Sequence, residues 1–189
     1  MQKLLWVEVR IVSESVRGLV MVYTGDGKGK TTAALGLALR QIGWGRRVFF
    51  LQFMKGEGNV YGERISAEKF LPDLKIEQCG RDSFVDLSDP DPIDRELAER
   101  GFERAVEAIN SGEYGLVVLD EACIAMACGL LCTQKVIGLI ESRPSHVDLV
   151  LTGRYCPQSI IDVADMVSEV KEIKHHFTKG VKARQGIEY

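Results

Sequence analysis

Glycine, lysine and threonine recur over residues 24–31 in a pattern that suits the binding of a phosphate chain. The general phosphate-binding loop reads G-x-x-x-x-G-K-[ST] and lies between a strand and a helix. Gly29-Lys30-Thr31 supply its last three positions, and Thr24 stands where the first glycine is usual. The apolar stretch before the loop and the helix-forming stretch after it favour a phosphate loop over a glycine-rich turn with surface lysines.

Each residue type in this loop has a physical role toward phosphate. Glycines let several backbone N–H groups turn inward, and the start of the following helix adds partial positive charge. Lys30 supplies a full charge, the Thr31 hydroxyl suits Mg²⁺, and Lys28 either reaches phosphate or stays solvated. The sequence therefore predicts that the triphosphate of ATP is held by Gly25, Asp26, Gly27, Lys28, Gly29, Lys30, Thr31 and Thr32.

A pair of carboxylates, Asp120-Glu121, follows the apolar run 116–119. An acid at the end of a buried strand is the form of the second nucleotide-binding motif, which places a carboxylate beside Mg²⁺. Many strands end in an acidic residue, so the pair indicates a magnesium site only because a phosphate loop is also present. Thr31, Asp120 and Glu121 are the predicted magnesium residues. Glu121 either helps to hold the metal or orients a water for hydrolysis, and the residues alone leave both roles open.

Arg154 follows another apolar run, 147–152, and a pair of histidines stands at 175–176. Ligands of open α/β sheets gather at the carboxyl ends of strands, so Arg154 is a candidate contact for the nucleotide, with a surface salt bridge as the alternative. The histidines are candidates for acid–base chemistry, but an exposed pair beside a basic tail is the simpler interpretation.

Alternating strand and helix patterns must position these residues, which indicates an α/β fold. Continuous apolar runs predict strands buried on both faces, and period-3.6 patterns predict helices between them. Asp91 is expected to be the N-cap of a helix that begins at Pro92 and runs to about Asn110. Strands are predicted at 19–23, 48–53, 74–78, 116–121, 147–152 and 166–173. Helices are predicted at 31–42, 60–72, 92–110, 122–130, 133–142 and 157–163.

Composition limits the class of protein. The chain has 189 residues, of which 46% are apolar, enough for one compact domain over 18–189, with residues 1–17 as an arm of uncertain placement. A net charge of −3 argues against a nucleic-acid partner. The absence of an 18-residue apolar run or a signal peptide argues for a cytoplasmic protein without a membrane span. Five cysteines without a CxxC pair are expected to be reduced.

At this point the motifs resemble the ATP:corrinoid adenosyltransferases, which make the adenosylated coenzyme form of vitamin B12. The likeness covers about residues 18–189, and threonine at the first loop position is typical of that family. Residues Lys174–Phe177 and Gly180–Tyr189 carry its most specific part, since other phosphate-loop proteins have nothing similar. The matching stretches are Tyr23–Thr32, Val117–Glu121, Leu151–Arg154, Lys174–Phe177 and Gly180–Tyr189.

The resemblance implies a RecA-like fold, often a homodimer, in which ATP presents its ribose 5′ carbon to a corrinoid substrate. Cobalt(I) would attack that carbon and tripolyphosphate would leave, so no general base is required. The protein would position the reactants and stabilise the leaving group through the loop and Mg²⁺. A flavoprotein is the implied electron donor.

Two segments depart from the family pattern. The family often has a basic N-terminal segment that folds over a neighbouring active site, whereas residues 1–17 are short and apolar here. Its corrinoid-side loop often carries Phe and Trp two residues apart, and this chain has Phe84-Val85-Asp86. Phe84 is therefore the expected corrinoid contact, without the accompanying Trp.

Three other functions compete with adenosyl transfer. A P-loop ATPase or small-molecule kinase would yield ADP rather than tripolyphosphate. A non-catalytic binding module for ATP or a corrinoid would bind without turnover. A RecA-like nucleic-acid motor is disfavoured by the acidic charge and small size, and salt-dependent binding to single-stranded DNA would mark it.

Overall fold

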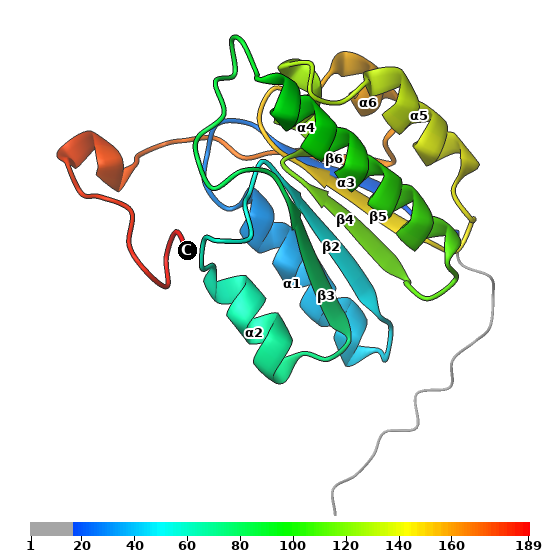
Figure 1. The fold of residues 1–189 in the computed structure, drawn as a ribbon. Helices are drawn as coiled ribbons and strands as arrows, with labels where there is room; N and C mark the ends of the chain where they lie inside the picture. Colours follow the sequence, from blue (N-terminus) through cyan, green and yellow to red (C-terminus); the bar gives the residue numbers. More distant parts are fainter. Residues whose placement is uncertain (1–16) are drawn as a thin grey trace, which may run out of the picture.

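The computed structural model describes residues 17–189, which form one six-stranded sheet with helices on both faces (Figure 1). All strand pairs are parallel, in the order β3-β2-β4-β5-β1-β6. This confirms the predicted α/β class and the parallel sheet of a RecA-like fold. The predicted arm lies outside the described residues except for Arg17.

The predicted elements are present with small changes in their limits. The strands are β1 (Val20–Thr24), β2 (Val48–Phe53), β3 (Leu74–Cys79), β4 (Leu116–Asp120), β5 (Asp148–Thr152) and β6 (Met166–Glu169). The helices are α1 (Lys30–Gly43), α2 (Gly62–Phe70), α3 (Pro92–Asn110), α4 (Ala122–Ala127), α5 (Thr133–Ser142) and α6 (Gln158–Val163), followed by a 3₁₀ turn, η1 (His176–Lys179). The prediction that β6 continues to residue 173 was wrong, because the chain leaves the sheet after Glu169.

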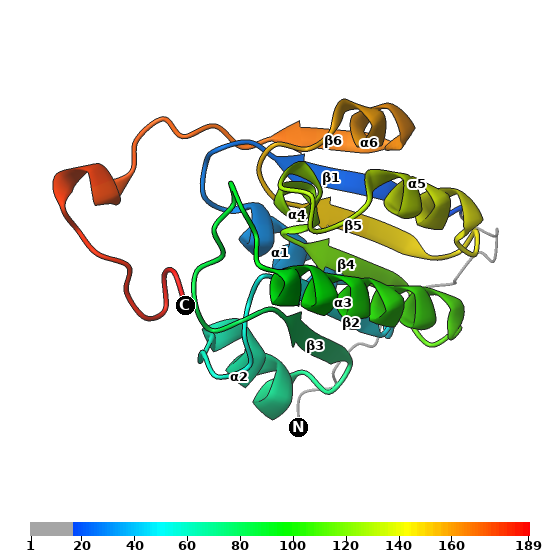
Figure 2. The ribbon, with the colours of Figure 1, turned by 45° about the horizontal axis from the view of Figure 1, so that its top comes forward.

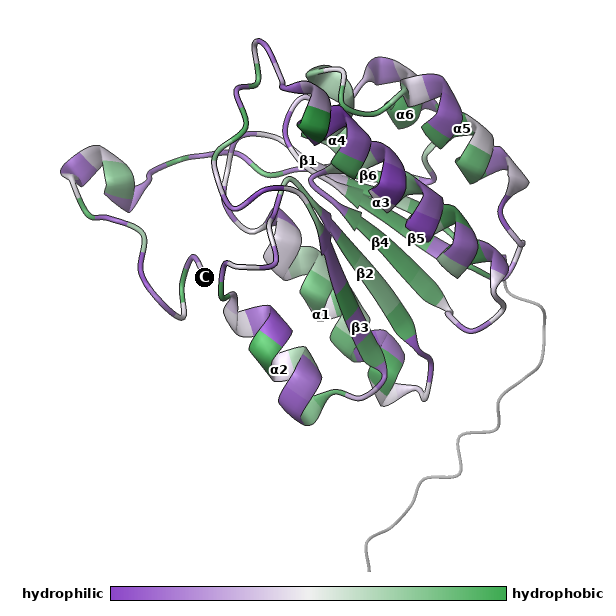
Figure 3. Ribbon diagram, viewed as in Figure 1, coloured by the Kyte–Doolittle hydropathy of each residue, from purple (hydrophilic) through white to green (hydrophobic). Residues whose placement is uncertain are grey.

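The central strands are apolar along most of their length, and the outer faces of the helices are largely polar (Figure 3). Strand β2 shows why. Phe49, Leu51 and Phe53 pack toward α3, α4, α5 and α6, while Val48 and Phe50 face α1 and α2. A strand covered on both faces needs apolar residues at nearly every position, and the one polar residue of β2, Gln52, is hydrogen-bonded to Asp120. Strand β3 is at the edge of the sheet and is correspondingly more polar.

Helix α3 spans the predicted residues, and its buried face overlaps the predicted one only in part, at Phe102 and Ile109. The predicted core stripe was Ile93, Leu97, Phe102, Val106 and Ile109. The residues that are buried are Asp94, Ala98, Gly101, Phe102, Ala105, Ala108 and Ile109, whereas Ile93 is 41% exposed. Close packing is the reason, since a Cβ added to Gly101 would lie 2.3 Å from the Cys79 Sγ. Small residues therefore contribute as much as Phe102 and Ile109 to the face of α3 that meets the sheet.

The start of α3 also differs from the prediction. Asp91 is at the N-cap position and Pro92 begins the helix, but the Asp91 side chain accepts no capping hydrogen bond. Instead it pairs with Arg81, whose guanidinium is 2.6 Å from both Asp91 Oδ2 and Asp94 Oδ2. Asp94 is buried, so this ion pair ties the loop after β3 to the first turn of α3.

The parallel strands all have their carboxyl ends along the same edge of the sheet, which lies across the strands rather than beside β3 (Figure 2). The loops that carry the predicted site residues begin at this edge. Helix α1 packs against β1, β4 and β5, which brings its first turn over that edge. Among the described residues, no helix is both long and apolar enough to cross a membrane.

Candidate functional site

The phosphate loop closes around the side chain of Lys30. Gly29 takes φ 113°, a conformation that L-residues rarely adopt, and α1 begins at the next residue. The Lys30 Nζ donates hydrogen bonds of 2.8 Å to the carbonyl oxygens of Gly25 and Gly27, and the residue is only 8% exposed. Burial lowers the pKa of Lys30. The buried ammonium therefore holds the loop in a curled shape and adds positive charge to its centre.

The first half of the loop packs against the segment that follows β6. A Cβ on Gly25 would lie 2.5 Å from the Val170 carbonyl oxygen, and one on Gly27 would lie 2.7 Å from Lys171. The Gly27 N–H donates to the Val170 carbonyl at 2.7 Å, so this N–H is not among those that face phosphate. Glycine is needed here for close approach of two backbones.

Thr24 has a structural partner that explains its place in the loop. Its hydroxyl accepts a hydrogen bond from the backbone N–H of Cys156 at 3.3 Å. That bond links the end of β1 to the turn after β5. A glycine at this position would have no side chain to accept it, so the departure from the general loop pattern tethers two neighbouring strand ends.

Asp120 is the fully buried centre of a polar network at the end of β4. Its Oδ1 accepts hydrogen bonds from the hydroxyls of Thr31, at 2.8 Å, and Thr152, at 2.6 Å. Its Oδ2 accepts from Gln52 Nε2 at 3.2 Å and from Lys55 Nζ at 3.4 Å. Four donors thus converge on one carboxylate, which fixes Thr31 relative to three strand ends.

Glu121 lies next to this network in a left-handed backbone conformation, with φ 63°. Its N–H donates to the Thr152 hydroxyl at 3.0 Å, which stabilises the turn. Burial first, and the nearby Asp120 second, raise the pKa of Glu121. Strained non-glycine residues cluster at functional sites, and Met54 and Tyr155, after β2 and β5, share this conformation. Glu121 is thus a half-buried carboxylate that a cation would stabilise.

Lys55 belongs to the site although the sequence analysis did not identify it. Its Nζ lies 3.4 Å from Asp120 Oδ2, 3.5 Å from Glu63 Oε1 and 4.8 Å from the centre of the Tyr61 ring. The sequence feature that could have identified Lys55 is its position just beyond the carboxyl end of a buried strand, β2. Lys55 therefore contacts one carboxylate oxygen of Asp120, Oδ2, whereas Thr31 contacts the other, Oδ1.

Two pockets meet at this edge of the sheet. One, of about 800 Å³, is lined by the loop residues Gly27 to Thr32 and by Lys55. The other, of about 720 Å³, is lined mostly by apolar side chains and includes Phe84. The residues that line both are Tyr61, Glu121, Arg154 and Tyr189.

The structure thus brings most of the predicted site residues together. Gly25, Asp26 and Asp120 line neither pocket, although Asp120 is hydrogen-bonded to Thr31, which does. Asp26 contacts Arg154 instead, whose Nη2 donates to the Asp26 carbonyl at 3.1 Å. Arg154 is thereby held at the boundary of the pockets. Phe84 is fully exposed on the far side of the second pocket.

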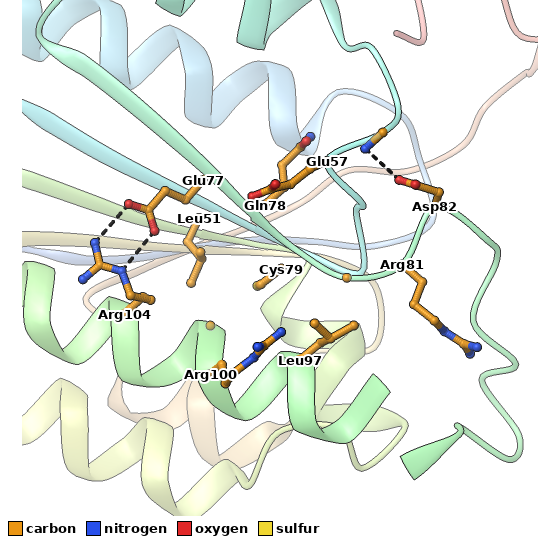
Figure 4. Close-up of a pocket in the computed structure, with 13 residues that line it drawn as sticks. Leu51, Glu57, Glu77, Gln78, Cys79, Arg81, Asp82, Leu97, Arg100 and Arg104 are labelled. Atoms are coloured by element: carbon orange, nitrogen blue, oxygen red, sulfur yellow. Dashed lines mark hydrogen bonds and ion pairs between the residues drawn. The ribbon is translucent and has the colours of Figure 1, made fainter. Parts of the chain in front are cut away.

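A third hollow, of about 560 Å³, lies between β3 and α3 (Figure 4). Glu77 and Arg104 form an ion pair along it at 3.0 Å, and Asp82 accepts a hydrogen bond from the Gly58 N–H. None of the predicted site residues lines it. Of the charged residues that line it, Glu77 and Arg104 pair with each other, whereas Arg81 pairs with two aspartates at the start of α3 that do not line the hollow.

The histidine pair differs from the expectation of an exposed pair. His175 and His176 are half-buried and stack on each other, with ring centres 4.5 Å apart. The His176 Nε2 lies 3.0 Å from Glu188 Oε1, and neither histidine lines the two pockets at the sheet edge. Their contacts therefore belong to the tail of the chain.

Comparison with known proteins identifies the family of this chain. A sequence model of the family described as ATP:corrinoid adenosyltransferase BtuR/CobO/CobP matches residues 16–189. The corrinoid adenosyltransferase CobA of Salmonella typhimurium is 35% identical over 184 residues, which are 97% of this chain and 92% of that protein. A corrinoid adenosyltransferase of Sinorhizobium is 36% identical over 92% of this chain and 81% of its own length.

A longer relative is also found. An uncharacterized protein of Nostoc, all2391, is 40% identical over 88% of this chain, which spans 47% of the length of that protein. The family match covers nearly all of the residues that form the sheet, the phosphate loop and both pockets. This chain therefore belongs to the ATP:corrinoid adenosyltransferase family.

Proposed function

We propose that this protein transfers the 5′-deoxyadenosyl group of ATP to the Co(I) of a corrinoid, in adenosylcobalamin synthesis or salvage. The observation that carries this proposal is the meeting of a phosphate-loop pocket with a mainly apolar pocket at four shared residues. Adenosyl transfer needs such a boundary, because an atom of the nucleotide must bond to an atom of the second substrate. The electron pair of Co(I) forms the Co–C5′ bond, and the C5′–O bond breaks to release tripolyphosphate.

The leaving group gathers negative charge, and the loop pocket supplies the compensating groups. Lys30 is fixed inside the loop, and Lys28, Lys55 and Arg154 line the same pocket. The start of α1 adds the N–H groups of its first turn. Fixed charges of this kind stabilise a transition state without reorganisation, so no general base is required.

Magnesium is the cation that this donor set fits. Glu121 is a half-buried carboxylate without a hydrogen-bond donor to its side chain among the described residues, and the Thr31 hydroxyl is held nearby by Asp120. Within residues 17–189 no three His, Cys, Asp or Glu side chains gather to hold a metal by themselves. Mg²⁺ usually takes a few protein oxygens and completes its shell with phosphate oxygens and water. We therefore propose Thr31 and Glu121 as its ligands, with Asp120 orienting Thr31.

The corrinoid is expected to occupy the mainly apolar pocket, with Phe84 against it. Phe84→Ala should lower the rate with complete cobalamin by about three- to tenfold, because one aromatic contact contributes about 0.5–1.5 kcal/mol. The loss should be smaller with a corrinoid that lacks the lower base, since no lower ligand must then be displaced. Comparing kcat/KM for the two corrinoids tests this, and equal losses on both would remove Phe84 from that role.

Further properties follow from the same proposal. A flavoprotein reductant is the expected source of Co(I), and the protein is expected to act in the cytoplasm as a homodimer with no nucleic-acid partner. Sedimentation of the purified protein tests the homodimer. Reduction of bound cob(II)alamin by a reduced flavoprotein tests the electron donor.

The product distinguishes this function from its competitors. The protein is mixed without oxygen with MgATP and chemically reduced cob(I)alamin, and the visible spectrum and tripolyphosphate are followed. A light-sensitive adenosylated product with equal tripolyphosphate is expected. ADP and phosphate instead would indicate an ATPase or kinase, and bound ATP without turnover would indicate a binding module.

A further inference from the structure

The tail of the chain returns to the active site from a distance. After β6 it runs away from the sheet, forms the turn η1 and comes back beside the start of α2 (Figures 1 and 2). A Cβ on Gly62, the first residue of α2, would lie 3.8 Å from the Tyr189 carbonyl. The Gly186 N–H donates to the same carbonyl at 2.7 Å. Residues 184–189, here called the return segment, thus form a compact turn against α2.

Glu188 anchors the return segment to the phosphate loop. Its Oε1 lies 3.0 Å from both Lys28 Nζ and His176 Nε2, and its side chain is 12% exposed. Its Oε2 accepts a hydrogen bond from the Arg184 N–H at 2.8 Å. That N–H first, and Lys28 second, lower the pKa of Glu188. The carboxylate is therefore ionised at neutral pH and links the loop, η1 and the return segment.

Considered without its other contacts, a carboxylate in this position is unfavourable for nucleotide binding. Glu188 lines the pocket that is expected to hold a triphosphate, and it offsets the charge of Lys28. The negative charge of Glu188 would repel the phosphates, and this repulsion is stronger where water is partly excluded. The benefit of Glu188 must therefore lie in what it fixes in place rather than in a direct contact with phosphate.

Tyr189 follows Glu188 directly in the chain and lines both pockets. Of the residues that line both pockets, Glu121 and Arg154 follow strands and Tyr61 precedes α2, whereas Tyr189 comes from the return segment. We propose that Tyr189 is a positioning residue for adenosyl transfer, held by the Glu188–Lys28 ion pair so that its ring forms one wall where nucleotide and corrinoid meet. This inference rests on the proposed function and adds the return segment to the active site.

The test separates positioning from nucleotide binding. Tyr189→Ala should lower kcat about tenfold, because small misplacements of reactants have large effects on rate. The Kd for MgATP, measured by calorimetry, should stay within about threefold, since the loop still holds the triphosphate. Tyr189→Phe should restore kcat and Tyr189→Leu should not, because a flat ring is required. Glu188→Gln should lower kcat while MgATP binds equally well or more tightly.

Matched controls come from the same tail. Phe177→Ala removes an exposed aromatic that lines neither pocket, and Glu172→Gln removes an exposed acid; both should leave kcat within about twofold. Wild-type kcat in Tyr189→Ala, full rescue by leucine, or weaker MgATP binding in Glu188→Gln would each overturn the inference while adenosyl transfer stands. Wild-type protein that makes no adenosylated corrinoid would overturn both proposals.

Discussion

Replacing Lys30 with alanine is expected to lower kcat for adenosyl transfer by roughly 30- to 1,000-fold, which corresponds to the loss of about 2–4 kcal/mol of transition-state stabilisation. The ammonium contributes in two ways. It carries the charge placed deepest in the loop, and its bonds to the Gly25 and Gly27 carbonyls hold the loop curled. Alanine removes both contributions at once. Steady-state assays of adenosylated product and tripolyphosphate measure the effect.

The fold should survive this change, because Lys30 makes its contacts within the loop and not with the apolar core. Circular dichroism and the midpoint of thermal unfolding check that point. Lys69→Ala, which removes an exposed lysine in the last turn of α2, is the matched control and should retain wild-type kinetics. Unchanged turnover in Lys30→Ala would show that residues 24–31 are not the phosphate loop of this enzyme.

The second large effect is on stability. Asp120→Ala is expected to lower the free energy of unfolding by about 3–5 kcal/mol, the usual cost of removing one partner from a buried ion pair. The substitution leaves Lys55 without its buried partner and leaves the hydroxyls of Thr31 and Thr152 without their acceptor. Urea unfolding followed by circular dichroism gives the difference between variant and wild type.

A double variant identifies the cause. In Asp120→Ala, Lys55 keeps only Glu63 as an ion-pair partner among the described residues. Replacing that lysine by methionine in the double variant, Asp120→Ala with Lys55→Met, should therefore make the protein lose less stability than Asp120→Ala alone. Asp89→Ala, at an exposed position, should change the free energy of unfolding by no more than about 0.5 kcal/mol. If the double variant is less stable than Asp120→Ala, the buried charge of Lys55 is not what makes the single change costly.

Most of the fold follows from local pattern. The apolar run of β2 requires cover on both faces, and its limits, Val48–Phe53, are those predicted. Helix α3 shows where pattern fails, because hydrophobicity favoured Ile93 whereas contact with β3 selected Gly101 and the alanines. Which face of a helix is buried depends on how closely two backbones approach, and single-sequence periodicity does not contain that distance.

The candidate site also has parts that the sequence predicted and parts that only the tertiary structure showed. The sequence by itself predicted the phosphate loop and the Asp120-Glu121 pair and pointed to the family, because loop, strand and helix are adjacent in the chain and their spacing is local. Only the tertiary structure decided that Lys55 lies beside Asp120, that Thr24 accepts the Cys156 N–H, and that Tyr189 lies between two pockets. These contacts join residues 65 or more positions apart. Such pairs meet only where the parallel sheet and its crossovers place the strand ends side by side.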